Sequence, residues 1–195
     1  MACDDWHESD IADGCDGSLV SSTVFRRDLA DLITKVKADC DYYSGTTVTS
    51  VRIQEMIDGF FTRWYATWAF TLGGINNISI PPYVEILVTH GRLSIYSAVI
   101  NHPTAPVEVK HFFRAAGLSS ALDVMQAAVR GESRLKSMPN NTVIMISFSA
   151  MISFRLSTLD YISNGDLAPS VRRLINETAE ALIRIGTTPP HRKGQ

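Results

Sequence analysis

The chain has 195 residues, of which 45% are hydrophobic and 19% charged, and its formal net charge at pH 7 is −2. This composition suffices for one globular domain with a substantial core, and the near-neutral charge excludes a general electrostatic attraction to nucleic acid. The three cysteines, Cys3, Cys15 and Cys40, lack the close spacing of a zinc knuckle and indicate free thiols in a reducing compartment.

The beginning of the chain is acidic. Residues 1–16 contain six acidic residues and no lysine or arginine. This composition predicts a solvated, disordered tail, which we place at residues 1–20. The alternative is an acidic segment that recruits partners through Trp6 and Ile11. No signal peptide is expected, because the first residues are acidic and no apolar run follows them.

Six later segments have apolar residues at three- and four-residue spacing, and no segment alternates with period two for long enough to indicate a strand. We therefore predict an all-α fold, an irregular bundle of about six helices. Thr104 is expected to cap the fourth helix, with Pro106 in its first turn. The expected helices cover approximately residues 22–40, 50–72, 82–100, 104–131, 141–162 and 169–186.

These helices are expected to form one domain over residues 21–188, followed by a flexible C-terminal end at residues 189–195. In the last helix, Arg173 with Glu177 and Glu180 with Arg184 are spaced for ion pairs along an outer face.

The segment from Val143 to Phe154 carries no charge. A membrane-spanning helix needs about 20 apolar residues, so a run of about 12 predicts a buried helix and no membrane insertion. Ser147, Ser149 and Ser153 lack the flanking glycines of a nucleophile elbow. A serine in a helix can instead donate its hydroxyl to a carbonyl one turn back.

Residue types that carry catalysis are scattered along the chain. No histidine has the spacing of a zinc enzyme, and no glycine-rich phosphate loop is present. We expect His90 and His111 to be surface or partly buried residues, and we expect neither an enzyme nor a cofactor. The aromatic residues of the second helix are expected in the core. Their alternative role is a pocket for a ligand or partner around Trp64, Trp68 and Tyr96.

Five segments occur in a characteristic order: "FFTRWYATWAF", "YVEILVTHGRLSIYSAVI", "FFRAAGLSSALDVMQ", "LKSMPNNTVIMISFSAMISFRL" and "INETAEALIRIGTTPPHRKG". Together they resemble the later part of the regulatory domain of fungal zinc-cluster transcription factors, which is called the fungal-specific transcription factor domain or middle homology region. The resemblance covers roughly residues 50–194, and its most specific element is the ending from Thr187 to Arg192.

The resemblance implies an all-α regulatory module in the nucleus. Such a module modulates transcription through protein partners, self-association or, in some members, a small-molecule effector, and it implies no catalysis. The family's DNA-binding unit, with six cysteines that hold two zinc ions, is not found in this sequence. Zinc and direct DNA contact are therefore expected only in a missing N-terminal unit. The alternative is a helical small-molecule-binding protein or enzyme with its pocket near Trp64, Trp68 and Tyr96.

Overall fold

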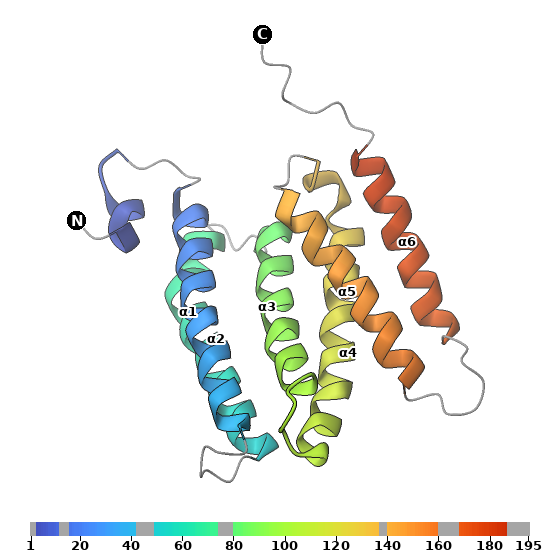
Figure 1. Cartoon of the computed structure of the whole chain (residues 1–195). Helices are drawn as coiled ribbons and strands as arrows, with labels where there is room; N and C mark the ends of the chain where they lie inside the picture. Colours follow the sequence, from blue (N-terminus) through green and yellow to red (C-terminus); the bar gives the residue numbers. More distant parts are fainter. Residues whose placement is uncertain are drawn as a thin grey trace.

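The computed structural model describes residues 3–11, 16–41, 49–73, 80–136, 140–159 and 168–186, and every regular element within them is a helix (Figure 1). The prediction of an all-α fold with about six helices is confirmed for this part of the chain. The elements, in chain order, are the 3₁₀-helix η1 (Cys3–Glu8), α1 (Asp16–Cys40), α2 (Ser50–Gly73), α3 (Pro82–Ile100), α4 (Val107–Arg130), the 3₁₀-helix η3 (Glu132–Arg134), α5 (Asn140–Leu159) and α6 (Pro169–Gly186).

Helix α3 lies at the centre of the bundle (Figure 1). On one side α3 contacts α1, and α1 in turn packs against α2. On its other side α3 contacts α4. Helix α5 packs across α3 and α4, and α6 packs mainly against α4. Because α3 has neighbours on several sides, its apolar residues surround the helix rather than forming one stripe. The buried apolar residues of α3 include Val84, Ile86, Leu87, Val88, Leu93, Ile95 and Val99.

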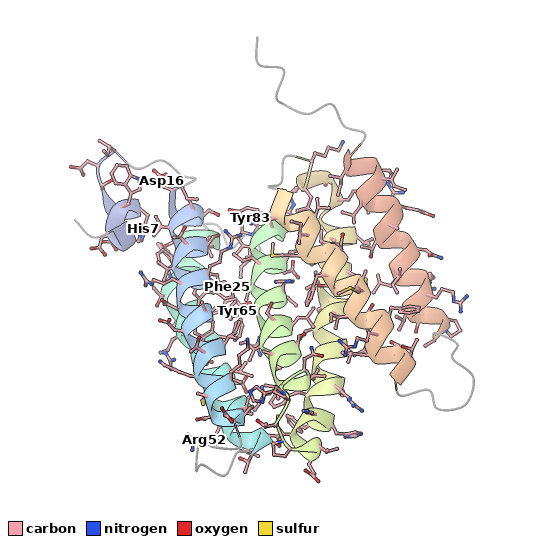
Figure 2. The ribbon with its side chains drawn as sticks, in the orientation of Figure 1. His7, Asp16, Phe25, Arg52, Tyr65 and Tyr83 are labelled. Atoms are coloured by element: carbon pink, nitrogen blue, oxygen red, sulfur yellow. The ribbon has the colours of Figure 1, made fainter. Side chains whose placement is uncertain are left out.

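An aromatic cluster joins α1, α2 and α3 around Phe25, which is fully buried. Figure 2 labels the position of Phe25. Its ring centroid lies 5.7 Å from that of Phe60, 5.9 Å from Phe61 and 5.3 Å from Trp64. Helix α3 reaches this ring through Gly91, where an added Cβ atom would lie only 2.6 Å from the Phe25 Cζ atom. The absence of a side chain at this position therefore sets the approach of α3 to α1.

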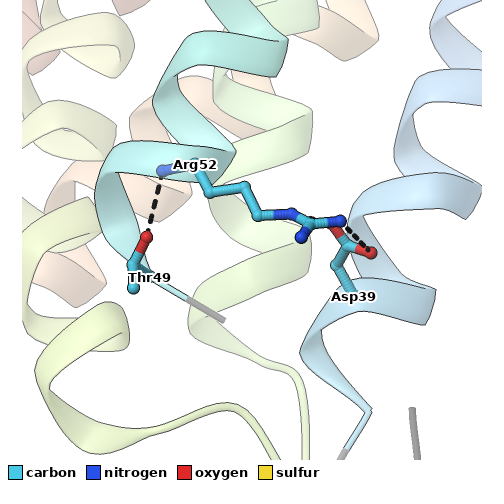
Figure 3. Close-up of polar contacts among 3 residues, drawn as sticks. All are labelled: Asp39, Thr49 and Arg52. Carbon is cyan, nitrogen blue, oxygen red and sulfur yellow. Dashed lines mark hydrogen bonds and ion pairs between the residues drawn. The ribbon is translucent and has the colours of Figure 1, made fainter. Parts of the chain in front are cut away.

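The end of α1 and the beginning of α2 are joined by polar contacts (Figure 3). Arg52 donates from its Nε and Nη2 atoms to the two carboxylate oxygens of Asp39, at 3.0 and 3.4 Å. The Oγ1 atom of Thr49 accepts a hydrogen bond of 3.2 Å from the Arg52 backbone N–H, as an N-cap residue does. These contacts fix the two helices beside each other on either side of residues 42–48.

Helix α1 begins earlier than the sequence predicts, at Asp16 rather than near Ser22. The residues before Ser22 lie against α2: an added Cβ atom at Gly17 would be 2.5 Å from the Thr71 Cγ2 atom, and Val20 is buried. The predicted tail at residues 1–20 is therefore wrong for its last residues, which belong to helix α1. The 3₁₀-helix η1 likewise occupies residues that were predicted to be an unstructured tail.

The expected N-cap of α4 is also wrong. The helix begins at Val107, with Pro106 rather than Thr104 at its N-cap position. The Thr104 hydroxyl instead donates a hydrogen bond of 3.2 Å to the carbonyl oxygen of Cys40, at the end of α1. This contact connects the turn before α4 to the far end of the first helix.

Helix α5 contains the uncharged segment, and its inner face is buried as predicted. Ile146 is fully buried, and the Ser149 hydroxyl donates a hydrogen bond of 2.8 Å to the Met145 carbonyl oxygen. Ser153 donates similarly to the carbonyl oxygen of Ala150, at 2.8 Å. The outer face, however, is exposed. Among the described residues, no helix is both long and apolar enough to span a membrane.

Helix α6 extends from Pro169 to Gly186, as predicted. Both predicted ion pairs are present: Arg173 lies 3.6 Å from Glu177, and Arg184 lies 3.7 Å from Glu180. Arg184 also donates two hydrogen bonds, of 2.8 and 3.0 Å, to the carboxylate of Glu132 in η3. The strongest element of the family resemblance, residues 187–192, lies outside the described residues, as does the predicted C-terminal end at 189–195.

Candidate functional site

A cavity of about 600 Å³ lies between η1, α1 and α2. Phe60, Trp64 and Trp68 recur at four-residue spacing on α2 and form its aromatic wall. Helix α1 contributes a second wall with the same helical periodicity, and η1 contributes three polar side chains. The lining residues outside the aromatic wall are Asp5, His7, Glu8, Val24, Asp28, Asp31, Leu32, Lys35, Arg63, Thr67 and Thr71.

The two tryptophans are held in fixed positions. Both are buried, and the Trp64 indole N–H donates a hydrogen bond of 3.5 Å to the carbonyl oxygen of Ser21 on α1. The ring of His7, on η1, lies against Trp68 with the ring centroids 4.8 Å apart. The indoles are therefore core residues, as their helical spacing predicts, and they offer the cavity only part of their surface.

Acidic side chains outnumber basic ones around this cavity. Asp5, Glu8, Asp28 and Asp31 line it, against Lys35 and Arg63. The carboxylate of Asp28 also accepts a hydrogen bond of 2.9 Å from the Arg27 Nε atom. Aromatic walls with carboxylates favour a ligand that combines an apolar body with a positive charge.

Tyr96 does not belong to this cavity. It lies on α3, where its ring stacks on that of Phe113 of α4 with the centroids 5.3 Å apart and an interplanar angle of 25°. The side of α3 that carries Tyr96 is covered by α4, which leaves the residue 4% exposed. The prediction that Tyr96 shares a pocket with Trp64 and Trp68 is therefore wrong, whereas the two tryptophans do lie together.

His90, on α3, is partly buried, as expected, and has an unusual environment. Its ring lies edge-on to that of Phe148 of α5, with the centroids 5.4 Å apart, and its Nδ1 atom lies 3.4 Å from the Ser94 hydroxyl oxygen. Burial, followed by the positive charge of Arg26, lowers the pKa of His90 to about 4. The imidazole is thus neutral at pH 7. Its spacing in the sequence gave no signal of this environment.

Cys40 is a further described residue whose side chain could react chemically. The thiol of Cys40 is buried at the end of α1, and this burial raises its pKa, which makes it a weak nucleophile. Within the described ranges, no three His, Cys, Asp or Glu side chains are grouped so that they could hold a metal ion.

A second surface feature lies on the outer face of α5. Ile144, Met151 and Phe154 are 68%, 58% and 55% exposed, and the small residue Ser147 lies exposed between them. We call these four residues the α5 stripe. The sequence shows that residues 143–154 carry no charge, and from this we predicted a buried helix. That prediction did not identify the exposed outer face of α5. An uncharged, apolar surface of this kind is typical of a site for protein contact.

Comparison of the chain with models of protein families, with curated proteins and with solved structures finds no match.

Proposed function

We propose that this chain is the regulatory and interaction module of a fungal transcription factor, located in the nucleus and acting through protein contacts. The observation that carries the proposal is the α5 stripe, an exposed apolar face on a helix whose one charged residue is Arg155. The order of the five family-like segments supports the same function. A small-molecule effector that adjusts these contacts is part of the proposal, and catalysis is not.

The distribution of basic residues favours protein contact over DNA contact. Specific DNA binding needs several arginines or lysines that neutralise phosphates, and a helix or arm that reads the bases. In this chain, arginines of three different helices are paired with acidic groups: Arg52 with Asp39, Arg92 with Asp58, and Arg184 with Glu132. DNA is therefore proposed to be reached only through a separate DNA-binding unit, which would also hold the zinc.

A reporter experiment tests this function. The chain is fused to the DNA-binding unit of an unrelated protein, and transcription from a matching promoter is measured in a fungal host. We expect the fusion to change reporter output, and a fusion that carries Ile146→Asp to lose the change, because an unpaired charge in the core unfolds the module. An unchanged reporter with the wild-type fusion, or nanomolar sequence-selective DNA binding by the chain alone, would contradict the proposal.

A second candidate function is favoured by the cavity at Trp64 and Trp68: a helical protein that binds a small molecule. The acidic and aromatic lining favours an aromatic or alkyl amine over a carboxylate of the same size. Thermal shift measurements with matched amine and carboxylate compounds test this, and Thr67→Phe, which fills part of the cavity, is the control. Equal shifts for both compound classes, or equal shifts for the wild type and the variant, would exclude this site.

A further inference from the structure

The α5 stripe has the spacing of a helix–helix contact. Its residues are separated by three, four and three positions, so they lie in one row on the surface of the helix. The opposite face of α5 already packs on α3 and α4, and Ile146, Ser149 and Ser153 are buried there. Among the residues that the structure describes, the stripe is therefore the uncovered side of a helix whose other side is fixed in the core.

The stripe also lacks charge, in contrast to the neighbouring surface helix. The outer face of α6 carries Arg173, Glu177, Glu180 and Arg184, as an ordinary solvent-exposed helix does. The exposed face of α5 carries Arg155 as its only charged residue. A partner with a charged binding face would find no complementary charge on this stripe, whereas a second uncharged stripe would fit it.

We propose that the α5 stripe binds the α5 stripe of a second copy of this chain, with the two helices antiparallel and related by a two-fold axis at the level of Ser149. This inference rests on the proposed interaction role and names its partner. In this register Ile144 of one copy lies opposite Phe154 of the other. Ser147 lies opposite Met151, so a small side chain faces a long flexible one. Each pair occurs twice, as a two-fold interface requires.

The charges agree with this register. Arg155 of each copy lies at an end of the contact, opposite Val143 of the other copy. The two arginines are then about 18 Å apart along the helix axis at 1.5 Å per residue. This separation exceeds the Debye length of about 8 Å at physiological salt, so their repulsion is largely screened. A parallel arrangement of the same helices would instead place the two arginines side by side.

The size of the contact predicts a weak dimer. The exposed parts of the apolar side chains amount to roughly 400 Å² in each copy, hence about 800 Å² in the pair, whereas stable interfaces bury about 1,200–2,000 Å². We therefore expect self-association with a dissociation constant in the micromolar range, which requires measurement at concentrations of about 100 μM.

Cysteine cross-linking tests the register. Two variants, Ser147→Cys and Met151→Cys, are made in a chain in which Cys3 and Cys15 are replaced by serine, and one variant carries a tag that changes its gel mobility. On mild oxidation we expect the mixture to form a cross-linked pair of tagged and untagged chains. Each variant alone should not cross-link, because identical positions are offset by about 6 Å along the axis. A disulfide needs Cα atoms within about 7 Å of each other. The axial offset, combined with the lateral distance between the two helices, places identical positions farther apart than this limit.

Sedimentation velocity at about 100 μM tests the surface. Wild-type chain should sediment partly as a dimer, and Phe154→Glu should abolish the dimer. Phe70→Glu is the matched control, because Phe70 is 77% exposed on α2, and it should behave as wild type. Circular dichroism verifies that both variants are folded. A monomeric wild type, a dimer that persists in Phe154→Glu, or cross-linking of the single variants would overturn the inference. The reporter assay tests the transcriptional role, whereas sedimentation and cross-linking test the α5 dimer. A failure of one proposal is therefore distinguishable from a failure of the other.

Discussion

Replacing Ile146 by alanine should destabilise the chain far more than the same change at Ile144. Both isoleucines lie on α5, but Ile146 is fully buried and Ile144 is 68% exposed. Truncating a buried isoleucine to alanine leaves a cavity and costs about 2–5 kcal/mol of unfolding free energy. For a chain of this size, about 2–4 °C of melting temperature is lost for each kcal/mol. The Ile146→Ala variant should therefore melt about 4–20 °C below the wild type.

The exposed position is the matched control. Ile144→Ala removes a side chain that is mostly in water, and alanine has the higher helix propensity, so the change should lie within about 0.5 kcal/mol. Thermal unfolding followed by circular dichroism at about 1 μM, where the proposed dimer is dissociated, measures both variants. Equal losses at the two positions would refute the assignment of the inner and outer faces of α5. So would a larger loss at Ile144.

Three further predictions concern other positions. His90 has a pKa of about 4 in the folded chain and 6.5 unfolded, so between these values the unfolded chain binds the extra proton. Stability should fall by up to about 3 kcal/mol as pH drops from 6.5 to 4. Urea titrations should show a flatter profile for His90→Gln, and identical profiles would contradict the burial. Gly91→Ala should cost about 1–3 kcal/mol through overpacking against the Phe25 ring. Gly59→Ala, whose added Cβ atom meets only the flexible Arg63 side chain, should stabilise helix α2, and equal melting temperatures would contradict both. Ser149→Ala should lower the unfolding free energy by no more than about 1 kcal/mol, because only the bond to Met145 is lost, and denaturant curves would expose a larger loss.

Helical periodicity predicts elements whose apolar residues form one stripe, and it fails where helix contacts use small or polar residues. The first turns of α1 contain Gly17, Ser18, Ser21 and Ser22, which have modest helix propensity and no apolar stripe. The hydroxyls of Ser21 and Ser22 donate to the carbonyl oxygen of Ser18, at 3.0 and 2.7 Å, but back-bonds of this kind do not favour a helix over other conformations. Gly17 in turn allows close packing on α2. Tertiary contact, rather than propensity, sets this end of the helix.

The candidate pocket shows a similar limit. Trp64 and Trp68 are four residues apart on one helix, so the sequence alone places them on the same face. Tyr96 lies on a different helix, and which neighbour covers it depends on the arrangement of the bundle. Because α3 has apolar residues around most of its circumference, its sequence does not indicate whether Tyr96 is directed towards α2 or α4.

Helices α3 and α5 have similar sequence character but different surroundings, and this difference is the physical reason to expect a partner. Both are rich in apolar residues around most of their circumference, which is typical of helices with neighbours on several sides. Helix α3 has such neighbours within the chain: α1, α4 and α5 all contact it. Helix α5 contacts α3, α4 and α6, and no other described element covers its outer face, where Ile144, Met151 and Phe154 are exposed. A sequence adapted to burial on both sides is thus covered on one side only by the described elements, and a second α5 helix supplies the missing neighbour while Arg155 of each copy stays at the edge of the contact.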